Sequence, residues 1–217
     1  MIPFQFNVKE GEGLNILCIG AHCDDIEIGC GATLLKLIEQ YEVNMLKWVV
    51  FTSNELRKKE AIASAKAFLK NIPQKEIIVL NYRDAFLQYS SLEIKEYFES
   101  IKANFQPHLV FTHYREDRHQ DHRLLSDLTW NTFRNHLILE YEIPKYDGDL
   151  GQPNYFCQVS SAQAKRKTDI LLEYFKSQKE KHWFDEETFL ALMRIRGMES
   201  ASPTRLAEAF YLRKGTF

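Results

Sequence analysis

A histidine and two adjacent aspartates stand directly after an apolar run near the start of the chain. The run, Leu14–Ile19, is typical of a buried parallel strand, and His22, Asp24 and Asp25 follow it. In open α/β sheets, ligands bind beyond the carboxyl ends of the strands. A His and an Asp at that edge can hold a metal, and a second carboxylate can act on a metal-bound water. Adjacent aspartates are also common at a helix N-terminus, where they only interact with the helix dipole.

A second group of polar side chains follows another apolar run, Pro107–Thr112. It contains His119, Asp121 and His122. The two histidines are three residues apart and share a face if a helix has begun there. Either can be a metal ligand, with Asp121 orienting one of them. An HxxH pattern alone is common on exposed helices, but both groups follow predicted parallel strands. We therefore expect them to converge on one edge of the sheet and form one metal site.

Strands and helices alternate over the first two-thirds of the chain. The predicted strands are Leu14–Ile19, Met45–Phe51, Glu76–Leu80 and Leu109–Thr112. The predicted helices are Cys30–Tyr41, Glu55–Leu69, Leu92–Asn104 and His119–His136. This alternation predicts an α/β fold with a Rossmann-like, mostly parallel sheet and helices on both faces.

The pattern changes after about His136. Glu140–Gly151 is rich in turn residues, and two strands and two helices are predicted beyond it. They are Asn154–Val159, Ala162–Gln178, Asp185–Arg196 and Glu208–Arg213. With 217 residues, one domain is favoured over two small ones. We expect a single domain over residues 1–217, with a core at about 14–136 and a C-terminal part that completes the pocket.

Bulk properties exclude several partner classes. The formal net charge of −2 gives no electrostatic reason to expect nucleic acid or an anionic membrane as a partner. No apolar run is long enough to span a bilayer, and the first residues lack the pattern of a signal peptide. The four cysteines show no disulfide or zinc spacing, which favours reduced thiols in a cytoplasmic protein.

The two polar groups and their surroundings resemble the LmbE-like, or PIG-L, family of zinc-dependent N-acetylglucosamine deacetylases. That family is marked by AHPDDxE and a later HPDH-type segment, which here read AHCDDIE over Ala21–Glu27 and HQDH over His119–His122. Arg57 and Glu60 match an RxxE pattern of the family, and Ala207–Phe210 resembles a recurring AEAF segment. The likeness covers nearly the whole chain.

Two residues depart from the family pattern. Cys23 and Gln120 stand where the family has proline. Proline stiffens the backbone and contributes no chemistry here, so its loss affects rigidity more than mechanism. The Cys23 side chain is expected to point away from the shared target of its neighbours.

The resemblance implies a metal site and a base. Its ligands would be His22, Asp25 and His122, which leaves one position for water. The metal would be zinc, although this ligand set also suits Fe(II). Asp24 would be the general base that takes the proton of the activated water.

The resemblance also implies supporting residues. A protonated His119 would stabilise the oxyanion, and Asp121 would orient His119 and favour its charged form. Arg57 would bind a substrate hydroxyl or acetate, unless it only pairs with Glu60 on its helix. Asp84 resembles a family residue near the pocket, although an ordinary turn residue is an equal alternative. Tyr114 lies beside the second motif and would contact substrate.

The function implied is the removal of an N-acetyl group from an N-acetylated amino sugar, either a conjugate or a sugar nucleotide. The alternatives are a zinc amidase for another N-acyl substrate and a non-catalytic binding protein on the same fold. A nucleotide-binding role is disfavoured, because Gly29–Ala32 lacks the GxGxxG spacing and follows two carboxylates. The expected partner is a small molecule, and the sequence leaves homo-oligomerisation open.

Overall fold

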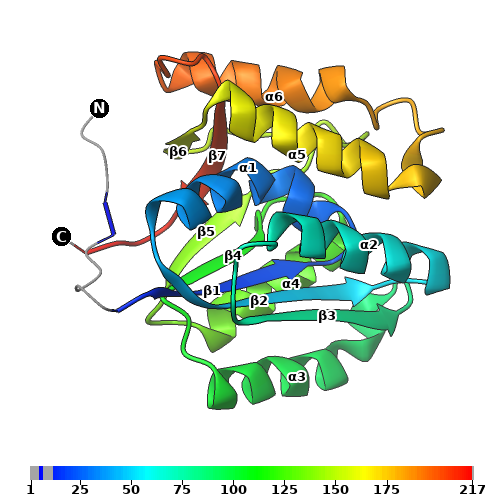
Figure 1. The fold of residues 1–217 in the computed structure, drawn as a ribbon. Coiled ribbons are helices and arrows are strands. Elements are labelled where there is room, and N and C mark those ends of the chain that lie inside the picture. Colours follow the sequence, from blue (N-terminus) through cyan, green and yellow to red (C-terminus); the bar gives the residue numbers. More distant parts are fainter. Residues whose placement is uncertain (1–4, 7–11, 217) are drawn as a thin grey trace.

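The computed structural model describes residues 5–6 and 12–216. Residues 12–216 contain one seven-stranded sheet with the order β3-β2-β1-β4-β5-β7-β6 (Figure 1). The strands are β1 (Leu14–Gly20), β2 (Val43–Thr52), β3 (Lys75–Tyr82), β4 (Leu109–His113), β5 (Leu137–Tyr141), β6 (Tyr155–Gln158) and β7 (Ala207–Leu212). The first five pair in parallel, whereas β7 pairs antiparallel to both β5 and β6. The prediction of a mostly parallel sheet is confirmed.

Helices cover both faces of this sheet, as predicted. They are α1 (Asp25–Gln40), α2 (Glu55–Phe68), α3 (Ser91–Asn104), α4 (Gln120–Thr132), α5 (Ser161–Tyr174) and α6 (Glu186–Glu199). Two short 3₁₀ turns, η1 (Leu87–Ser90) and η2 (Lys176–Gln178), precede α3 and follow α5. Within the described ranges, no helix combines the length and apolarity needed to cross a membrane.

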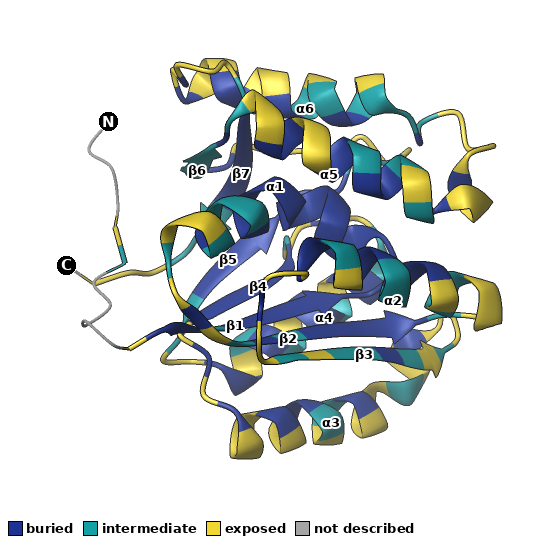
Figure 2. Ribbon diagram, viewed as in Figure 1, coloured by how far each residue is buried: buried dark blue, intermediate teal, exposed yellow. Residues whose placement is uncertain are grey.

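Alternate residues of the central strands enter two different hydrophobic cores. On β1, Ile16 and Cys18 pack with α1, α2 and α5, whereas Leu17 and Ile19 pack with α3 and α4. This two-sided burial explains why the strand reads as a continuous apolar run. Figure 2 shows the sheet and the inner helix faces buried, with exposed residues on the outer helix faces.

Several element boundaries differ from the prediction. Strand β5 was not predicted, and the turn-rich stretch expected from Glu140 overlaps its last two residues; β5 lies between β4 and β7 in the sheet. This strand is hard to recognise from sequence, because the buried carboxylate of Glu140 interrupts its apolar pattern. Its charge is met by Arg213, whose Nη2 lies 2.6 Å from Oε2, and by Trp130 Nε1 at 2.5 Å from Oε1. Arg213 lies 73 residues away in the sequence.

The helix ends also shift. Helix α1 begins at Asp25, well before the predicted start at Cys30, because the acidic residues form its first turn instead of a loop before it. Helix α4 ends at Thr132 and not at His136, and α5 ends at Tyr174 and not at Gln178. The predicted end of α5 falls in η2, where the chain tightens into a 3₁₀ turn.

Helix α1 approaches the sheet closely at Gly29. A Cβ atom at this position would lie 2.2 Å from Cδ2 of Tyr141 on β5. In an exposed helix, Gly→Ala ordinarily stabilises by about 1 kcal/mol. At Gly29 the overlap with Tyr141 makes the same substitution destabilising, so packing requires glycine at this position.

We expect Gly29→Ala to lower the free energy of unfolding by about 1–3 kcal/mol, the usual effect of overpacking a core. Denaturant titration followed by circular dichroism measures this change. Gly215→Ala is the control, because a Cβ added there would lie 3.9 Å from its nearest neighbour, Leu212 Cδ2, and meet no overlap. Equal stability of Gly29→Ala and the wild type would contradict the packing argument.

Candidate metal centre and its cavity

The two sequence motifs meet because β1 and β4 are neighbours in the sheet. Cys18 on β1 is in register with Phe111 on β4, so both strands end at the same edge. The loop after β1 is fixed from both sides. The Ala21 N–H donates to Nε2 of His113 at 2.9 Å, and its carbonyl accepts from Thr52 N and Oγ1, each at 2.8 Å. His113, which was not assigned from sequence, thus ties the end of β4 to the first motif.

The structure brings the three expected ligands into a triangle. His22 Nδ1 lies 3.0 Å from His122 Nε2 and 3.2 Å from Asp25 Oδ2. The third side, from His122 Nε2 to Asp25 Oδ2, is 3.6 Å. A tetrahedral centre with metal–ligand distances of about 2.0–2.2 Å separates its ligand atoms by about 3.3–3.6 Å. Two of the three sides, at 3.0 and 3.2 Å, are a few tenths of an ångström shorter than this, so small side-chain rotations would bring the three donor atoms to the spacing of a zinc-like ion.

The charges of these groups are set by burial and by each other. Burial, followed by the neighbouring His113, lowers the pKa of His122 to about 3, which keeps its imidazole neutral and available as a ligand. Burial opposes ionisation of Asp25, but His122 and His22 outweigh it and hold the pKa of Asp25 well below its usual value. Asp25 is thus an anion at neutral pH.

Each of the two histidines expected as ligands meets a carboxylate through its other ring nitrogen. His122 Nδ1 lies 2.8 Å from Oδ2 of Asp117, and His22 Nε2 lies 3.0 Å from Oδ1 of Asp84. Lys145 Nζ donates to the same Asp117 oxygen at 2.9 Å. Carboxylates in this position orient metal-binding imidazoles and fix their tautomer. Sequence reasoning assigned no role to Lys145, because its contact with Asp117 joins residues that are 28 positions apart.

Asp24 and Arg57 form an ion pair beside the triangle. Asp24 is buried at the N-cap of α1, and its Oδ1 lies 2.8 Å from Nη2 of Arg57. Arg57 is placed in the first turn of α2 by Asn54, whose side chain accepts from the Arg57 backbone N–H at 2.9 Å. Burial opposes the charge of Arg57, but Asp24 outweighs it and raises the Arg57 pKa. The main partner of Arg57 is therefore Asp24 and not Glu60.

Glu60 binds the C-terminal part of the chain at Ser177. Its carboxylate accepts from the backbone N–H of Ser177 at 2.8 Å and from the Ser177 hydroxyl at 2.6 Å. The distance from Glu60 Oε2 to Arg57 Nη1 is 3.6 Å. The two residues of the RxxE pattern thus bind different partners, Arg57 the base candidate Asp24 and Glu60 the 3₁₀ turn η2. They do not merely pair with each other on the helix surface.

The expected role of Asp121 differs from its position. The Asp121 carboxylate accepts from the backbone N–H groups of Ala85 at 2.7 Å and Leu87 at 3.1 Å, and not from the ring of His119. Only the Asp121 backbone N–H reaches His119, donating to Nδ1 at 3.3 Å. Burial and the neighbouring His22 lower the pKa of His119. The Asp121 carboxylate therefore does not contact the His119 ring as expected, and although its charge raises the His119 pKa, burial and His22 outweigh it.

The triangle lies in the wall of an open cavity of about 770 Å³. His22, Asp25 and His122 line it together with the remaining expected site residues Asp24, Arg57, Asp84 and His119. The C-terminal part supplies another wall, through Ile143–Asp147 and through Ser177, Gln178, Lys181 and Trp183. Tyr114 lies elsewhere. Its ring stacks on Tyr211 with centroids 3.7 Å apart, and its hydroxyl donates to Glu116 at 3.1 Å.

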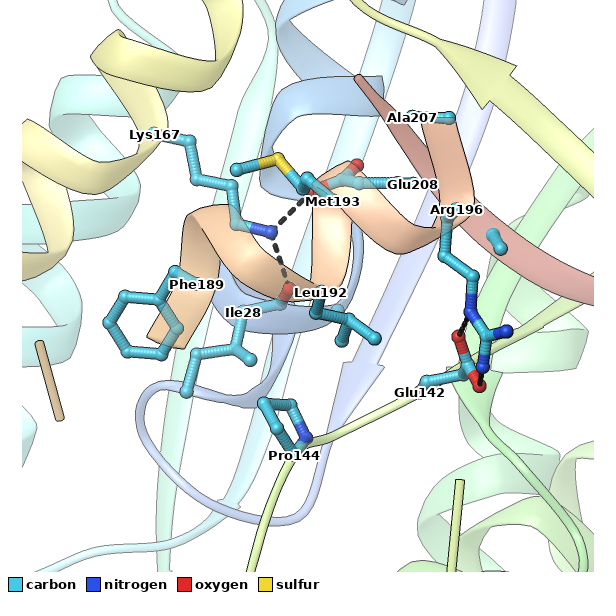
Figure 3. A pocket seen from close by; sticks show the side chains of 12 residues that line it. Ile28, Glu142, Pro144, Lys167, Phe189, Leu192, Met193, Arg196, Ala207 and Glu208 are labelled. Atoms are coloured by element: carbon cyan, nitrogen blue, oxygen red, sulfur yellow. Dashed lines mark hydrogen bonds and ion pairs between the residues drawn. The ribbon is translucent and has the colours of Figure 1, made fainter. Parts of the chain in front are cut away.

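A second, much smaller cavity lies between α1, α6 and β7. Figure 3 shows its lining, where Lys167 points toward Ile28 and Glu208, and Arg196 toward Glu142. Arg196 is buried, and its Nη2 lies 2.6 Å from Glu142 Oε1 and 3.1 Å from the carbonyl of Gly151. It thus holds both ends of the segment that carries Lys145.

Cys23 points away from the ligand triangle, as expected. Its Sγ donates to the carbonyl of Thr52 at 3.4 Å, and burial raises the pKa of its thiol to about 12. In the described residues, the groups of side chains with metal-ligand spacing do not include Cys23.

Because the thiolate is the nucleophile in alkylation, a thiol with a raised pKa reacts slowly at pH 8. We expect iodoacetamide to modify Cys23 in the native protein at least about 10-fold more slowly than in the denatured chain. Peptide mass spectrometry after timed quenching measures both rates. Equal rates in the native and denatured protein would show that Cys23 is accessible and ionised.

Comparison with known proteins places these observations in a family. The family model described as PIG-L, GlcNAc-PI de-N-acetylase, matches residues 17–133, which is more than half of the chain. A protein of Escherichia coli K12 described as the uncharacterized deacetylase YaiS is 32% identical over 140 residues, covering 59% of this chain and 74% of that protein.

Solved structures share the fold. The N,N'-diacetylchitobiose deacetylase from Pyrococcus horikoshii, in complex with its inhibitor MPG, superposes with a TM-score of 0.68 at 24% identity, over 94% of this chain and 85% of that one. The zinc-inhibited form of the teicoplanin deacetylase Orf2 superposes with a TM-score of 0.67 at 16% identity, over 91% and 97% of the two chains. Together with the matched motifs, these findings show that the chain belongs to the PIG-L family.

Proposed function

We propose that the chain is a metal-dependent N-deacetylase that hydrolyses the acetamide of an N-acetylated amino sugar. The observation that carries this proposal is the triangle of donor atoms from His22, Asp25 and His122, with sides of 3.0–3.6 Å, in the wall of a large cavity. Family membership supports the reaction class. The two-histidine, one-carboxylate set favours zinc and also suits Fe(II).

A divalent metal held by these three side chains would supply Lewis acidity to a water and to the acyl oxygen. The proton of the attacking water must then pass to a base. Asp24 is proposed for this step, because it is buried next to the ligand Asp25 and lines the same cavity. Arg57, whose Nη2 lies 2.8 Å from Asp24 Oδ1, lines the same cavity and is proposed to bind a substrate hydroxyl or the product acetate.

His119 is proposed to stabilise the oxyanion as a neutral imidazole. Its Nδ1 accepts the Asp121 backbone N–H, so the neutral ring carries its proton on Nε2, which can donate to developing negative charge. A neutral donor agrees with the lowered pKa of His119. Asp121 is proposed to act through the segment that follows β3, where its carboxylate holds the backbone next to Asp84.

The substrate class follows from the size and lining of the cavity. A volume of about 770 Å³ is in the range of sites that hold drug-sized ligands, which favours a conjugate or sugar nucleotide over a free monosaccharide. Asp84 and Arg57 are proposed as polar contacts to that substrate. A cytoplasmic location is also proposed, supported by the four cysteines, which all lie in the described residues and are free thiols.

The proposal is tested by an acetate-release screen with the zinc-loaded protein. The panel contains N-acetylglucosamine, several of its glycosides and nucleotide conjugates, and matched N-propionyl compounds. Release of acetate from at least one acetamido sugar supports the proposal. Turnover of other N-acyl compounds alone would replace it with a different amidase, and a zinc-loaded protein without turnover on the panel would favour the non-catalytic alternative.

We expect Asp24→Asn to retain the metal but to lose about 10²–10⁴-fold in kcat, the usual contribution of a general base. Acetate release at saturating substrate measures kcat, and metal analysis of the same sample confirms loading. Asp147→Asn is the matched control, since Asp147 is an exposed carboxylate in the cavity wall. Comparable kcat values for the two variants would remove Asp24 from the mechanism.

We expect Asp117→Asn to weaken zinc binding about 10–100-fold, because the amide orients His122 less firmly than the carboxylate does. Competition with a chromophoric chelator measures the dissociation constant. Asp149→Asn is the matched control, because Asp149 also binds Lys145, with Oδ2 2.6 Å from Nζ, but lies next to no ligand histidine. If both variants weaken binding equally, the effect belongs to Lys145 and not to the Asp117–His122 contact.

A further inference from the structure

The Ala207–Phe210 segment has no role in the proposed reaction, yet its glutamate is buried and bonded to the helix that carries Asp25. We infer that Glu208 of β7 and Lys167 of α5 are a positioning pair, which fixes the first turn of α1 and thereby the orientation of the ligand Asp25. This inference rests on the proposed metal site. It adds two residues from the C-terminal part of the chain to the determinants of metal affinity.

The contacts of the pair are short and fully buried. Lys167 and Glu208 are 2% and 4% exposed, and Lys167 Nζ lies 2.6 Å from Glu208 Oε1. The same ammonium donates to the carbonyl of Ile28 at 2.6 Å, and Figure 3 shows both contacts. The Glu208 carboxylate accepts from two backbone N–H groups of α1, from Ala32 at 3.0 Å and from Thr33 at 2.7 Å.

These bonds fall inside the helix and not at its end. In an α-helix the N–H of residue 32 ordinarily bonds to the carbonyl of residue 28, and that of residue 33 to residue 29. Here the Ala32 N–H is directed to Glu208, and the Ile28 carbonyl receives Lys167. The first turn of α1 begins with Asp25. The ion pair therefore supplies hydrogen bonds at the place where this first turn joins the rest of the helix.

The same part of α1 contains two glycines. Gly29 and Gly31 lie between Ile28 and Ala32, and glycine has the largest backbone freedom of any residue. Gly29 packs on the ring of Tyr141, and a Cβ at Gly31 would lie 3.0 Å from Phe68 and 3.4 Å from Lys167 Cγ. The two glycines leave room for the side chains that pack on α1. The ion pair fixes the direction of the helix axis between the two glycines. The contact of the Lys167–Glu208 pair with α1 thereby sets the direction of the Asp25 side chain.

A structural role alone makes a different prediction from a positioning role. A buried ion pair that only stabilises can be exchanged for other buried groups with its effect confined to stability. A positioning pair changes metal affinity by more than its effect on stability explains. The two quantities are measured on the same apo-protein samples, as the midpoint of thermal unfolding and as the dissociation constant for Zn²⁺ from chelator competition.

Glu208→Gln is the primary variant. Its amide oxygen can accept one of the two α1 N–H groups, but its amide nitrogen then faces the other donor. We expect this variant to weaken Zn²⁺ binding at least about 10-fold, as removal of residues behind metal ligands does. Ile170→Ala is the control, because Ile170 is fully buried on the same helix as Lys167 and lies in the core. It should lower the unfolding midpoint and leave the Zn²⁺ dissociation constant unchanged.

Lys167→Met gives a second measurement that does not depend on the folding of Glu208→Gln. Its thioether chain fills the path of the lysine methylenes but cannot donate to Ile28. Weaker Zn²⁺ binding in either folded variant, with the control unchanged, supports the inference. Zn²⁺ binding as tight as wild type in a folded variant with a lowered unfolding midpoint overturns it. A wild-type protein that binds no Zn²⁺ would instead overturn the proposed metal site itself.

Discussion

The parallel pairing of β1 with β4 is the constraint on which the site depends. The strand order β3-β2-β1-β4-β5 reverses direction between these two strands, so the chain leaves β1 toward α1 on one face and β4 toward α4 on the other. Loops that diverge in this way leave a crevice at the carboxyl ends of the strands. His22 and Asp25 follow one strand and His122 follows the other. The proposed ligand set is therefore complete only when this pair of strands has formed.

Buried charge is the cost of assembling such a site, and at Asp117, Asp121 and Glu208 the structure offsets this cost by pairing or hydrogen-bonding the carboxylate. An isolated carboxylate in the interior is strongly unfavourable, whereas a paired and hydrogen-bonded one is tolerated. Asp117 meets His122 and Lys145, Asp121 meets two backbone N–H groups, and Glu208 meets Lys167 and α1. Each pairing also fixes a segment of chain near the cavity. The polar groups around the ligands therefore determine shape as well as charge.

The parts of this arrangement that could be predicted from sequence are those encoded locally. The runs that form β1 and β4 and the polar residues after them lie within short stretches. The expected convergence of the two motifs followed from this, because parallel strands end at one shared edge of a sheet. Strand β5 was missed because Glu140 breaks its apolar pattern, and its partner Arg213 is far away in the chain. The same limit applies to Lys145, whose contact with Asp117 links two distant loops, and to Asp121, whose partners follow β3.

The two positions where the family has proline show how local rigidity can be replaced by side-chain contacts. Cys23 Sγ donates to the carbonyl of Thr52 at the end of β2, and Gln120 Nε2 donates to the carbonyl of Ala85 at 3.2 Å. A proline restricts only its own backbone, whereas these hydrogen bonds join each motif to a neighbouring segment. Gln120 and Asp121 together bind both polar groups of Ala85, next to Asp84. The start of α4, which carries His122, thus holds the segment whose Asp84 carboxylate meets His22, and so links the two proposed histidine ligands.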